Sequence, residues 1–493
     1  MTQAALTMQG VTQQFGSVKA LDQVSFQANW GHIQALVGEN GAGKTTLMRI
    51  LHGSLKPTNG EVSLADPKAK VGMVSQHYAI MPELSCLENL MLGAEPGQWI
   101  DPAPNEARAQ KLADQMGFKF DWRRPASSLG AGEAQKLEIL KLLWRESQIM
   151  ILDEPTAMLS PADGEALYES LKLLAAQGKC IIVVTHRLSE VMDYCSQVTV
   201  LRQGRLIDSK PVSDVTTRQI AELIVGHGIE PPVITPPTLG ATVLETKQIS
   251  LLDDRKNLAL KDVSFSLKAG EVVGIAGVDG SGQKELFHAL LGIKPLAGGS
   301  IDLGGKAAPT NTRERLAWGM RVIPEDRLEE GVIPSWSLEL NGVLGLQRRP
   351  EVSSGPWVNK EARRTWAEKA AALFSTKHGG LDLPMSSLSG GNQQRFAAAR
   401  AMAPGGKLHL AFQPARGLDI DGTAQIYQEL RRQCREEGSA ALVVSFDLDE
   451  LLAQCDRILV MFRGTLAAPP EHLAKDRQAI GRLMVGMKEG AEA

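Results

Sequence analysis

The sequence predicts an α/β protein with two tandem domains, each built around a phosphate-binding loop. Residues 38–45 read G-E-N-G-A-G-K-T, which fits the pattern G-x-x-x-x-G-K-S/T at every fixed position. Residues 277–284 repeat the loop as G-V-D-G-S-G-Q-K, with Gln283 at the lysine position and Lys284 at the Ser/Thr position. A chain of 493 residues is also long enough for two hydrophobic cores. The sequence therefore indicates a duplicated domain with one intact loop and one altered loop.

Each loop lies between a predicted strand and a predicted helix. Apolar runs rich in β-branched residues at 32–37 and 272–276 predict the strands, and helical patterns at 45–51 and 285–291 predict the helices. Strand, loop and helix in this order form the context that separates a phosphate loop from a chance match. Both loops are therefore interpreted as phosphate loops.

Later motifs repeat in the same order along the chain. L-G-A-G-E at 129–133 matches L-S-G-G-N at 388–392, an offset of 259, whereas the two loops are 239 residues apart. The second half is thus some 20 residues longer in this part, and repeats of this length are duplicated domains. We expect domains at 1–228 and 242–493. A proline-rich connector at 229–241 joins them, and is either a plain linker or just long enough for the halves to face each other.

Composition excludes several classes of function. A net charge of −3 gives no basic footprint for nucleic acid, and five scattered cysteines without a C-x-x-C pair indicate neither disulfides nor a metal site. No run of 18 apolar residues predicts a membrane span, and the N-terminus lacks the features of a signal peptide. We expect a protein of the reducing cytoplasm that reaches a membrane only through a partner.

The first loop has the residue types that bind the phosphates of a nucleotide. Glycine permits tight turns and close approach, and backbone N–H groups at a helix start attract anions. Lys44 would supply a positive charge to the β- and γ-phosphates, and the Thr45 hydroxyl would bind Mg²⁺. The residues expected around the phosphates are Gly38, Glu39, Asn40, Gly41, Ala42, Gly43, Lys44, Thr45 and Thr46.

Two carboxylates follow the predicted apolar strand at 148–152. Asp153 fits a Mg²⁺ ligand, and Glu154 fits the base that polarises an attacking water. A carboxylate at the end of a buried strand is costly unless it meets a cation, which favours this interpretation. The alternative is that the pair simply begins a surface turn before Pro155.

Three further residues are candidates for the same site. His186, after the predicted strand 180–184, is placed to contact the γ-phosphate or orient the water, although a histidine at a strand end is often structural. Gln76, after the predicted strand 71–74, suits a sensor of Mg²⁺ and water, but glutamine is common in loops. Phe15 either stacks on adenine or belongs to the core.

These motifs make the chain resemble an ATP-binding-cassette (ABC) protein over nearly its whole length, in two copies. The most specific element is the signature L-S-G-G-N-Q-Q-R at 388–395, with a partial counterpart, L-G-A-G-E-A-Q-K, at 129–136. Two fused cassettes with one altered phosphate loop are similar to the ATPase subunits of bacterial importers for simple sugars and nucleosides. The segments 74–96 and 322–331 look most like the nucleoside branch.

The resemblance implies a fold and a set of partners. Each cassette would have a RecA-like core, an antiparallel β subdomain and a helical subdomain that carries the signature. In the first half the helical subdomain falls within 77–128 and would form a groove for a permease helix. The chain would lie at the cytoplasmic face of the cell membrane, bound to two permease subunits. An extracytoplasmic solute-binding protein would be an indirect partner, and no nucleic acid would be bound.

The resemblance also implies that each ATP is held between the phosphate loop of one cassette and the signature of the other, so that the halves pair within the chain. Site one would take Lys44, Thr45, Gln76, Asp153, Glu154 and His186 from the first half and Ser389, Gly390, Gly391 and Asp419 from the second. Site two would take Gln283, Glu325, Phe412, Gln413 and Phe446, with Gly130 and Ser160 from the first half. Every alteration falls in site two, so we expect hydrolysis of ATP with Mg²⁺ in site one only. Lys284 either takes the place of Mg²⁺ in site two or points to solvent.

We therefore expect an ATPase that energises the import of a nucleoside or a simple sugar. The alternative is a soluble tandem-cassette ATPase that acts on ribosomes or DNA. Such proteins usually have a long charged linker and a basic surface, whereas this chain has a short proline-rich connector and a net charge of −3. The transported solute cannot be read from this chain, because specificity would lie in the partners.

Overall fold

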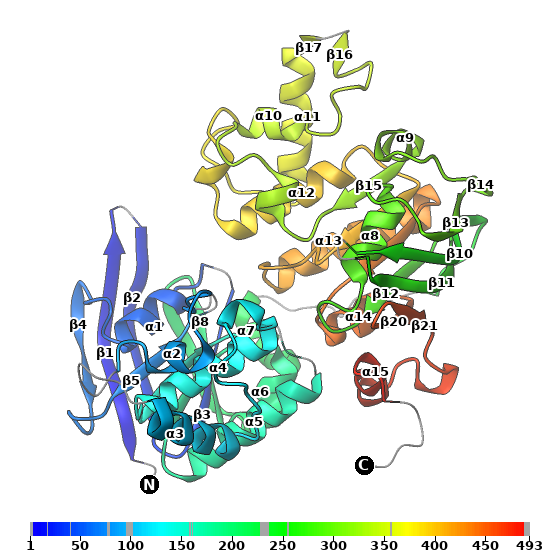
Figure 1. Cartoon of the computed structure of the whole chain (residues 1–493). Coiled ribbons are helices and arrows are strands. Elements are labelled where there is room, and N and C mark those ends of the chain that lie inside the picture. Colours follow the sequence, from blue (N-terminus) through cyan, green and yellow to red (C-terminus); the bar gives the residue numbers. More distant parts are fainter. Residues whose placement is uncertain are drawn as a thin grey trace. The chain divides into compact units, whose positions relative to one another are not determined.

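A computed structural model describes residues 3–16, 18–39, 41–75, 79–94, 102–156, 159, 161–226, 236–253, 256–354 and 357–487. The chain divides into two compact units, Met1–Pro231 and Pro232–Ala493 (Figure 1). In the described part of the chain, no helix has both the length and the apolar character needed to cross a membrane.

The first unit is built on a six-stranded sheet. The strand order is β5 (Val71–Val74), β6 (Ile149–Asp153), β7 (Cys180–Val184), β3 (Ile33–Val37), β8 (Gln197–Arg202) and β9 (Arg205–Pro211). The first five strands are parallel, and β9 is antiparallel to β8. β3 and β7 are buried along their whole length, as expected for parallel strands with both faces covered.

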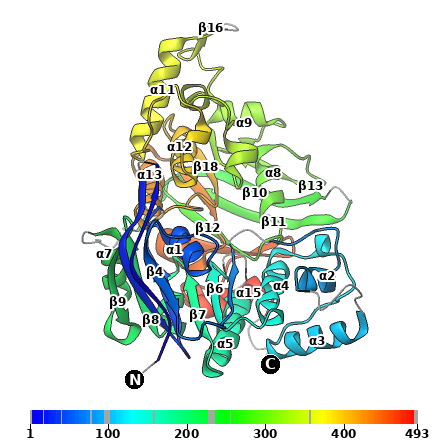
Figure 2. The same cartoon turned by 90° about the vertical axis from the view of Figure 1, so that its left-hand side faces the viewer.

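A second, antiparallel sheet and seven described α-helices complete the first unit. The sheet has the order β2 (Val18–Asn29), β1 (Ala4–Phe15) and β4 (Asn59–Leu64). The helices are α1 (Lys44–Leu51), α2 (Cys86–Met91), α3 (Pro102–Gln115), α4 (Ala131–Trp144), α5 (Pro161–Ala176), α6 (Leu188–Tyr194) and α7 (Thr217–Val225). The helices α2, α3 and α4 pack on one another and form the helical part of this cassette (Figure 2).

The second unit repeats this architecture. Its six-stranded sheet has the order β15 (Met320–Ile323), β18 (Leu408–Phe412), β19 (Ala440–Val444), β12 (Val272–Ala276), β20 (Arg457–Phe462) and β21 (Thr465–Ala467). Its antiparallel sheet has the order β11 (Leu258–Lys268), β10 (Thr242–Leu252), β13 (Gly298–Leu303) and β14 (Lys306–Ala307). The predicted fold class, two tandem α/β cassettes, is confirmed.

The extra residues of the second half lie in two places. The offset between equivalent positions is 239 at the loops and 249 at β5 and β15, because β14 and α9 (Thr312–Trp318) precede β15. It rises to 259 at β6 and β18. The intervening part contains α10 (Leu338–Gly342), the short hairpin of β16 (Ser353–Ser354) and β17 (Trp357–Val358), and α11 (Lys360–Leu373) (Figure 1).

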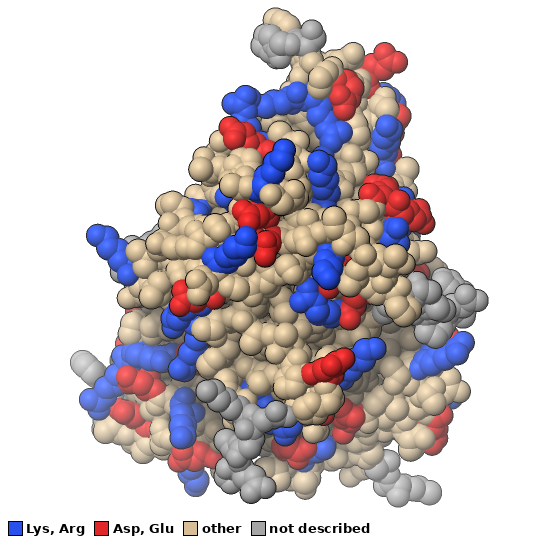
Figure 3. Space-filling model, turned by 90° about the vertical axis from the view of Figure 1, so that its right-hand side faces the viewer, with Lys and Arg blue, Asp and Glu red and all other residues tan. Residues whose placement is uncertain are grey.

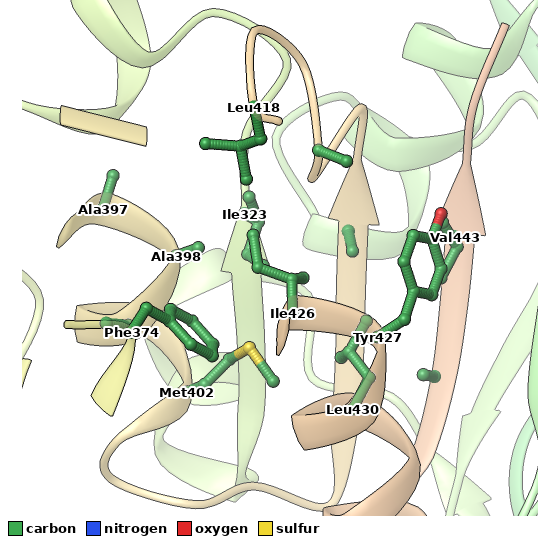
Figure 4. Packing of buried hydrophobic residues seen from close by; sticks show 14 of the residues in the cluster. Ile323, Phe374, Ala397, Ala398, Met402, Leu418, Ile426, Tyr427, Leu430 and Val443 are labelled. Carbon is green, nitrogen blue, oxygen red and sulfur yellow. The ribbon is translucent and has the colours of Figure 1, made fainter. Parts of the chain in front are cut away.

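A buried apolar cluster anchors the signature helix α12 (Gly390–Met402) in the second unit. Phe374 and Met402 pack with Ile426 and Tyr427 of α13 (Ile420–Glu437) and with Ile323 of β15 (Figure 4). Each of these side chains is at most 3% exposed, and burial of such a side chain contributes about 1.5–3 kcal/mol. This packing fixes the position of Ser389, which is the N-cap residue of α12. The last two helices are α14 (Leu448–Gln454) and α15 (Arg477–Met484).

Candidate nucleotide site

The first phosphate loop connects β3 to α1 and depends on its glycines. A Cβ atom on Gly38 would lie 2.1 Å from the Leu201 carbonyl oxygen, and one on Gly43 would lie 2.6 Å from that of Ala20. Gly43 also has a φ of 102°, which favours glycine. The Lys44 ammonium group donates to the carbonyl oxygens of Gly38 at 2.6 Å and Glu39 at 2.9 Å. The lysine therefore curls over the loop and brings its charge to where phosphates would bind.

Asp153, Glu154 and His186 lie at the carboxyl ends of neighbouring strands, β6 and β7. The Glu154 Oε1 is 3.0 Å from the His186 Nδ1. Glu154 has a φ of 49°, and its N–H donates to the Val184 carbonyl oxygen at 2.8 Å, so the backbone turns sharply at the end of β6. The structure thus brings together a carboxylate and an imidazole that the sequence places 32 residues apart.

The two carboxylates differ in how easily they ionise. Burial, helped by the charge of Glu154, raises the pKa of Asp153 to about 6, and only Lys44 opposes this rise. Burial also raises the pKa of Glu154, but the His186 hydrogen bond and the charges of His186, Lys44 and Arg187 outweigh it, so that the pKa is lowered overall. A divalent cation would neutralise Asp153, whereas Glu154 is already ionised. This donor set fits Mg²⁺, for which Asp153 and the Thr45 hydroxyl would be the protein ligands.

Of the other residues predicted for the two sites, some lie outside the described part of the chain. Asn40 and Gln76 lie outside the described residues, as does Ser160 of the second predicted site. Phe15 is at the end of β1 and is 49% exposed, so its side chain is not part of the core. Its stacking on adenine stays a prediction.

The second phosphate loop keeps its shape but loses its charge. Gln283, at the position of Lys44, is only 2% exposed, and its amide donates to the Val278 carbonyl oxygen at 3.1 Å. Val278 corresponds to Glu39, so the glutamine reproduces one of the two lysine hydrogen bonds with a neutral donor. The Lys284 ammonium group lies 3.9 Å from Glu325 and 3.8 Å from Glu330.

Aromatic rings replace the carboxylate and the histidine in the second unit. Phe412, at the position of Asp153, is 3% exposed, and its ring lies edge-on to Phe287 at 5.2 Å and to Phe446 at 6.1 Å. Phe446 is at the position of His186. Gln413 has the same φ of 49° as Glu154 and the same backbone hydrogen bond, here to Val444. The backbone is conserved between the units, but an apolar cluster occupies the place of the metal ligand. Phe287 could not have been found from the phosphate-loop pattern, because α8 (Gln283–Leu291) carries it outside the motif.

The signature differs between the units at its first turn. The Ser389 hydroxyl accepts hydrogen bonds from the Asn392 N–H at 3.4 Å and its side-chain amide at 3.0 Å, which leaves the hydroxyl hydrogen to donate. Asp419 caps α13 at Gly422 and pairs with Arg395 at 2.7 Å. In the first unit Gly130 precedes α4 and has no hydroxyl. A Cβ atom on Gly391 would lie 3.3 Å from the Gly417 carbonyl oxygen, so the signature lies beside the loop that leads to Asp419.

A large cavity lies beside α8 in the second unit. Its volume is about 1140 Å³. It is lined by Phe287 and His288 of α8, by the end of β15 and by residues of the helical part, including Leu346 and Arg349. Phe412 forms part of its wall. The cavity thus connects the altered metal position to the helical part of this cassette.

The fold and these sites define a tandem pair of phosphate-loop ATPase domains. The family model for ABC transporters matches residues 21–157 and 260–414. The chain is 36% identical over 503 residues to "Nucleoside import ATP-binding protein NupA" of Lactococcus lactis subsp. cremoris, covering 98% of each chain. It is 34% identical over 508 residues to "Guanosine import ATP-binding protein NupO" of Bacillus subtilis, covering 99% of each.

The chain belongs to the ABC transporter family and is an ATPase. A third relative, "Ribose import ATP-binding protein RbsA 3" of Rhizobium meliloti, is 34% identical and covers 93% of this chain and 92% of its own. Among solved structures, the complex of the archaeal ribosomal stalk protein aP1 with the ribosome recycling factor aABCE1 has a TM-score of 0.69. It covers 96% of this chain and 92% of its own, but at 17% identity it shows the fold alone.

Proposed function

We propose that this protein is the ATP-hydrolysing subunit of an importer for a nucleoside or a simple sugar, and that it cleaves ATP in only one of two composite sites. The observation that carries the proposal is the contrast between the two strand ends after β6 and β18. The first has Asp153 and Glu154, with His186 in contact, and the second has Phe412 and Gln413 against Phe446. The three relatives named above are all import ATP-binding proteins.

In the proposed active site each side chain has one task. Lys44 and the loop N–H groups hold the β- and γ-phosphates, and Asp153 with Thr45 would hold Mg²⁺, which when bound neutralises phosphate charge. Glu154 is ionised and accepts a proton from the attacking water, while His186 orients Glu154 through the 3.0 Å contact. The hydroxyl of Ser389, contributed by the second cassette, would donate to the γ-phosphate.

The distribution of the altered residues supports two composite sites. If the sites were each formed within one cassette, the intact signature around Ser389 would serve the altered loop, and the glycine variant at Gly130 would serve the intact loop. Pairing across the cassettes instead gathers all intact parts into one site. The aromatic cluster around Phe412 leaves no ligand for Mg²⁺ at the second strand end, so that site would hold nucleotide without cleaving it.

The membrane partner is proposed to bind at the helical parts of the cassettes. The cavity beside α8 joins the second phosphate loop to the helical part, so a permease helix seated there would sense changes at the nucleotide. The protein would thereby lie at the cytoplasmic face of the membrane, and an extracytoplasmic binding protein would deliver the solute to the permeases. Nucleotide-driven closure would then be coupled to the opening of the transport path.

An alternative role on ribosomes or DNA has less support. The structural likeness to a ribosome recycling factor reflects the shared fold at 17% identity. The face drawn in Figure 3 mixes Lys and Arg with Asp and Glu rather than gathering positive charge, and the net charge is −3. Both features favour the importer.

The proposal is tested by comparing equivalent substitutions in the two cassettes. Glu154→Gln should lower ATP turnover by about 10²–10⁴, whereas Gln413→Ala should leave it within twofold. Cells that lack the protein should regain uptake of a radiolabelled nucleoside or sugar with the wild-type chain and with Gln413→Ala, but not with Glu154→Gln. Equal losses in both variants would contradict the asymmetry. Unchanged uptake together with stable co-sedimentation with ribosomes would favour the alternative.

A further inference from the structure

A second-cassette arginine lies against the signature motif. The Arg327 Nη2 would be 2.8 Å from a Cβ atom built on Gly390, so the guanidinium group rests directly on the backbone of the signature. The Arg327 Nε donates to the Gln393 Oε1 at 3.4 Å. Gln393 in turn donates to the carbonyl oxygens of Met385 at 3.2 Å and Leu388 at 3.1 Å, immediately before Ser389. The side chain of Arg327 is therefore held at the start of α12.

The charges around this arginine come from Asp326, which raises its pKa, and from Arg416, which lowers it, and neither residue forms an ion pair with it. In the described part of the chain, no carboxylate oxygen lies within ion-pair distance of Arg327 or of Arg416, whose charge acts on it. Asp326 uses its carboxylate to cap the N–H groups of Leu328 and Glu329. The start of α12 adds the positive end of a helix of 13 residues. Burial and the charge of Arg416 both lower the pKa of Arg327, opposed by Asp326. An anion bound here would pair with a guanidinium group that no carboxylate of the described residues contacts.

The first cassette lacks this arrangement. When β5 is aligned with β15, an offset of 249, Tyr78 is the counterpart of Arg327. When β6 is aligned with β18, an offset of 259, Ala157 is the counterpart of Arg416. Ala131 stands in place of Gly390. In the second cassette, a Cβ atom at position 390 would lie 2.8 Å from the Arg327 Nη2. Ala134 stands in place of Gln393, which removes the acceptor for the Nε. All four positions therefore change together, and the arginine set belongs to the cassette with the intact signature.

We propose that Arg327 is a further γ-phosphate ligand of the active composite site, presented by the second cassette together with Ser389 and held in place by Gln393. The inference rests on the composite site proposed above. A guanidinium group suits this task because its planar N–H donors match phosphate oxygens and its charge persists at all physiological pH values. Arg327 would add a second cation to the charge of Lys44 at the γ-phosphate, where negative charge accumulates during cleavage. Arg416 reinforces the potential without direct contact.

The test separates γ-phosphate binding from a structural role. In the full chain, Arg327→Met should lower kcat at least about tenfold, while Arg327→Lys keeps the charge and loses less. In a Glu154→Gln background, which traps ATP, Arg327→Met should weaken binding of ATP at least about tenfold but leave binding of ADP within about twofold, because ADP has no γ-phosphate. Arg364→Met is the matched control, since Arg364 is exposed on α11 and pairs with Glu368. Guanidinium ion at a non-denaturing concentration should partly restore turnover in Arg327→Ala.

Each outcome decides between the possibilities. Wild-type kcat in Arg327→Met would overturn the inference, as would equal weakening of ATP and ADP, which would mark a structural role. If Arg327→Met is fully active but Glu154→Gln is inactive, only the arginine inference fails. If Glu154→Gln itself keeps wild-type turnover, the proposed function fails instead.

Discussion

Replacing Asp153 with asparagine should stabilise the nucleotide-free protein while abolishing its activity. The carboxylate lies at the end of β6, where burial and the charge of Glu154 raise its pKa from 3.8 to about 6. A rise of about two pKa units corresponds to about 3 kcal/mol, because each unit is about 1.4 kcal/mol. Ionisation of Asp153 therefore lowers the free energy of unfolding of the nucleotide-free protein by about 3 kcal/mol.

The sign and the pH dependence follow from this raised pKa. The folded state holds the proton more tightly than the unfolded state, so the contribution of Asp153 to stability is fully present below pH 3.8. It is lost as the pH rises through about 6. At pH 8 the full cost applies, and Asp153→Asn removes it. At pH 5 the gain should fall to about half, because the folded carboxyl is already protonated.

Thermal unfolding of the full chain in the presence of a chelator measures the change in stability on Asp153→Asn. Hydrogen exchange on the β6 peptide assigns the unfolding transition to the first cassette. The expected gain of about 3 kcal/mol raises Tm by about 6–12 °C at pH 8. The matched change in the second cassette, Phe412→Asn, should instead cost at least about 3 kcal/mol, because Phe412 is buried between Phe287 and Phe446. No gain in stability from Asp153→Asn at pH 8, or an equal gain at pH 5, would show that the pKa of Asp153 is not raised in the folded state.

Three further predictions concern the phosphate loops. Gln283→Lys restores the loop charge but neither metal ligand nor base, so kcat should stay at the wild-type value; a doubled kcat would show that the lysine alone was missing. The Mg²⁺ concentration for half-maximal ATPase should rise about tenfold per pH unit below pH 6, where Asp153 is protonated, and an unchanged value at pH 5.5 would refute this. Gly38→Ala should abolish ATP binding, measured by equilibrium titration, because its Cβ would lie 2.1 Å from a carbonyl oxygen; wild-type affinity would contradict the close packing.

The sequence predicts the central sheet well because local composition determines it. The predicted strands 71–74, 180–184 and 272–276 coincide with β5, β7 and β12, since buried parallel strands require unbroken apolar runs. Helix starts are less accurate. The helix predicted over 45–51 begins at Lys44 as α1, and the helix predicted over 285–291 begins at Gln283 as α8.

The site was predictable as far as motifs describe it. The loop, Asp153, Glu154 and His186 are identifiable because each occupies a fixed place in an ordered series. The aromatic cluster around Phe412 and the contact between Arg327 and Gln393 depend on packing between segments 34 or more residues apart, which no local pattern reports. Those features become visible only once the strands and α12 are placed in space.

Blocking each signature in turn shows whether the intact phosphate loop works with the signature of the other cassette. Steady-state ATPase of the full chain would be measured for Ser389→Arg and Gly130→Arg, with ATP binding to the first loop monitored in parallel. We expect Ser389→Arg to abolish turnover and Gly130→Arg to leave it near the wild-type rate. Turnover that survives Ser389→Arg and disappears in Gly130→Arg would show that each loop works with the signature of its own cassette.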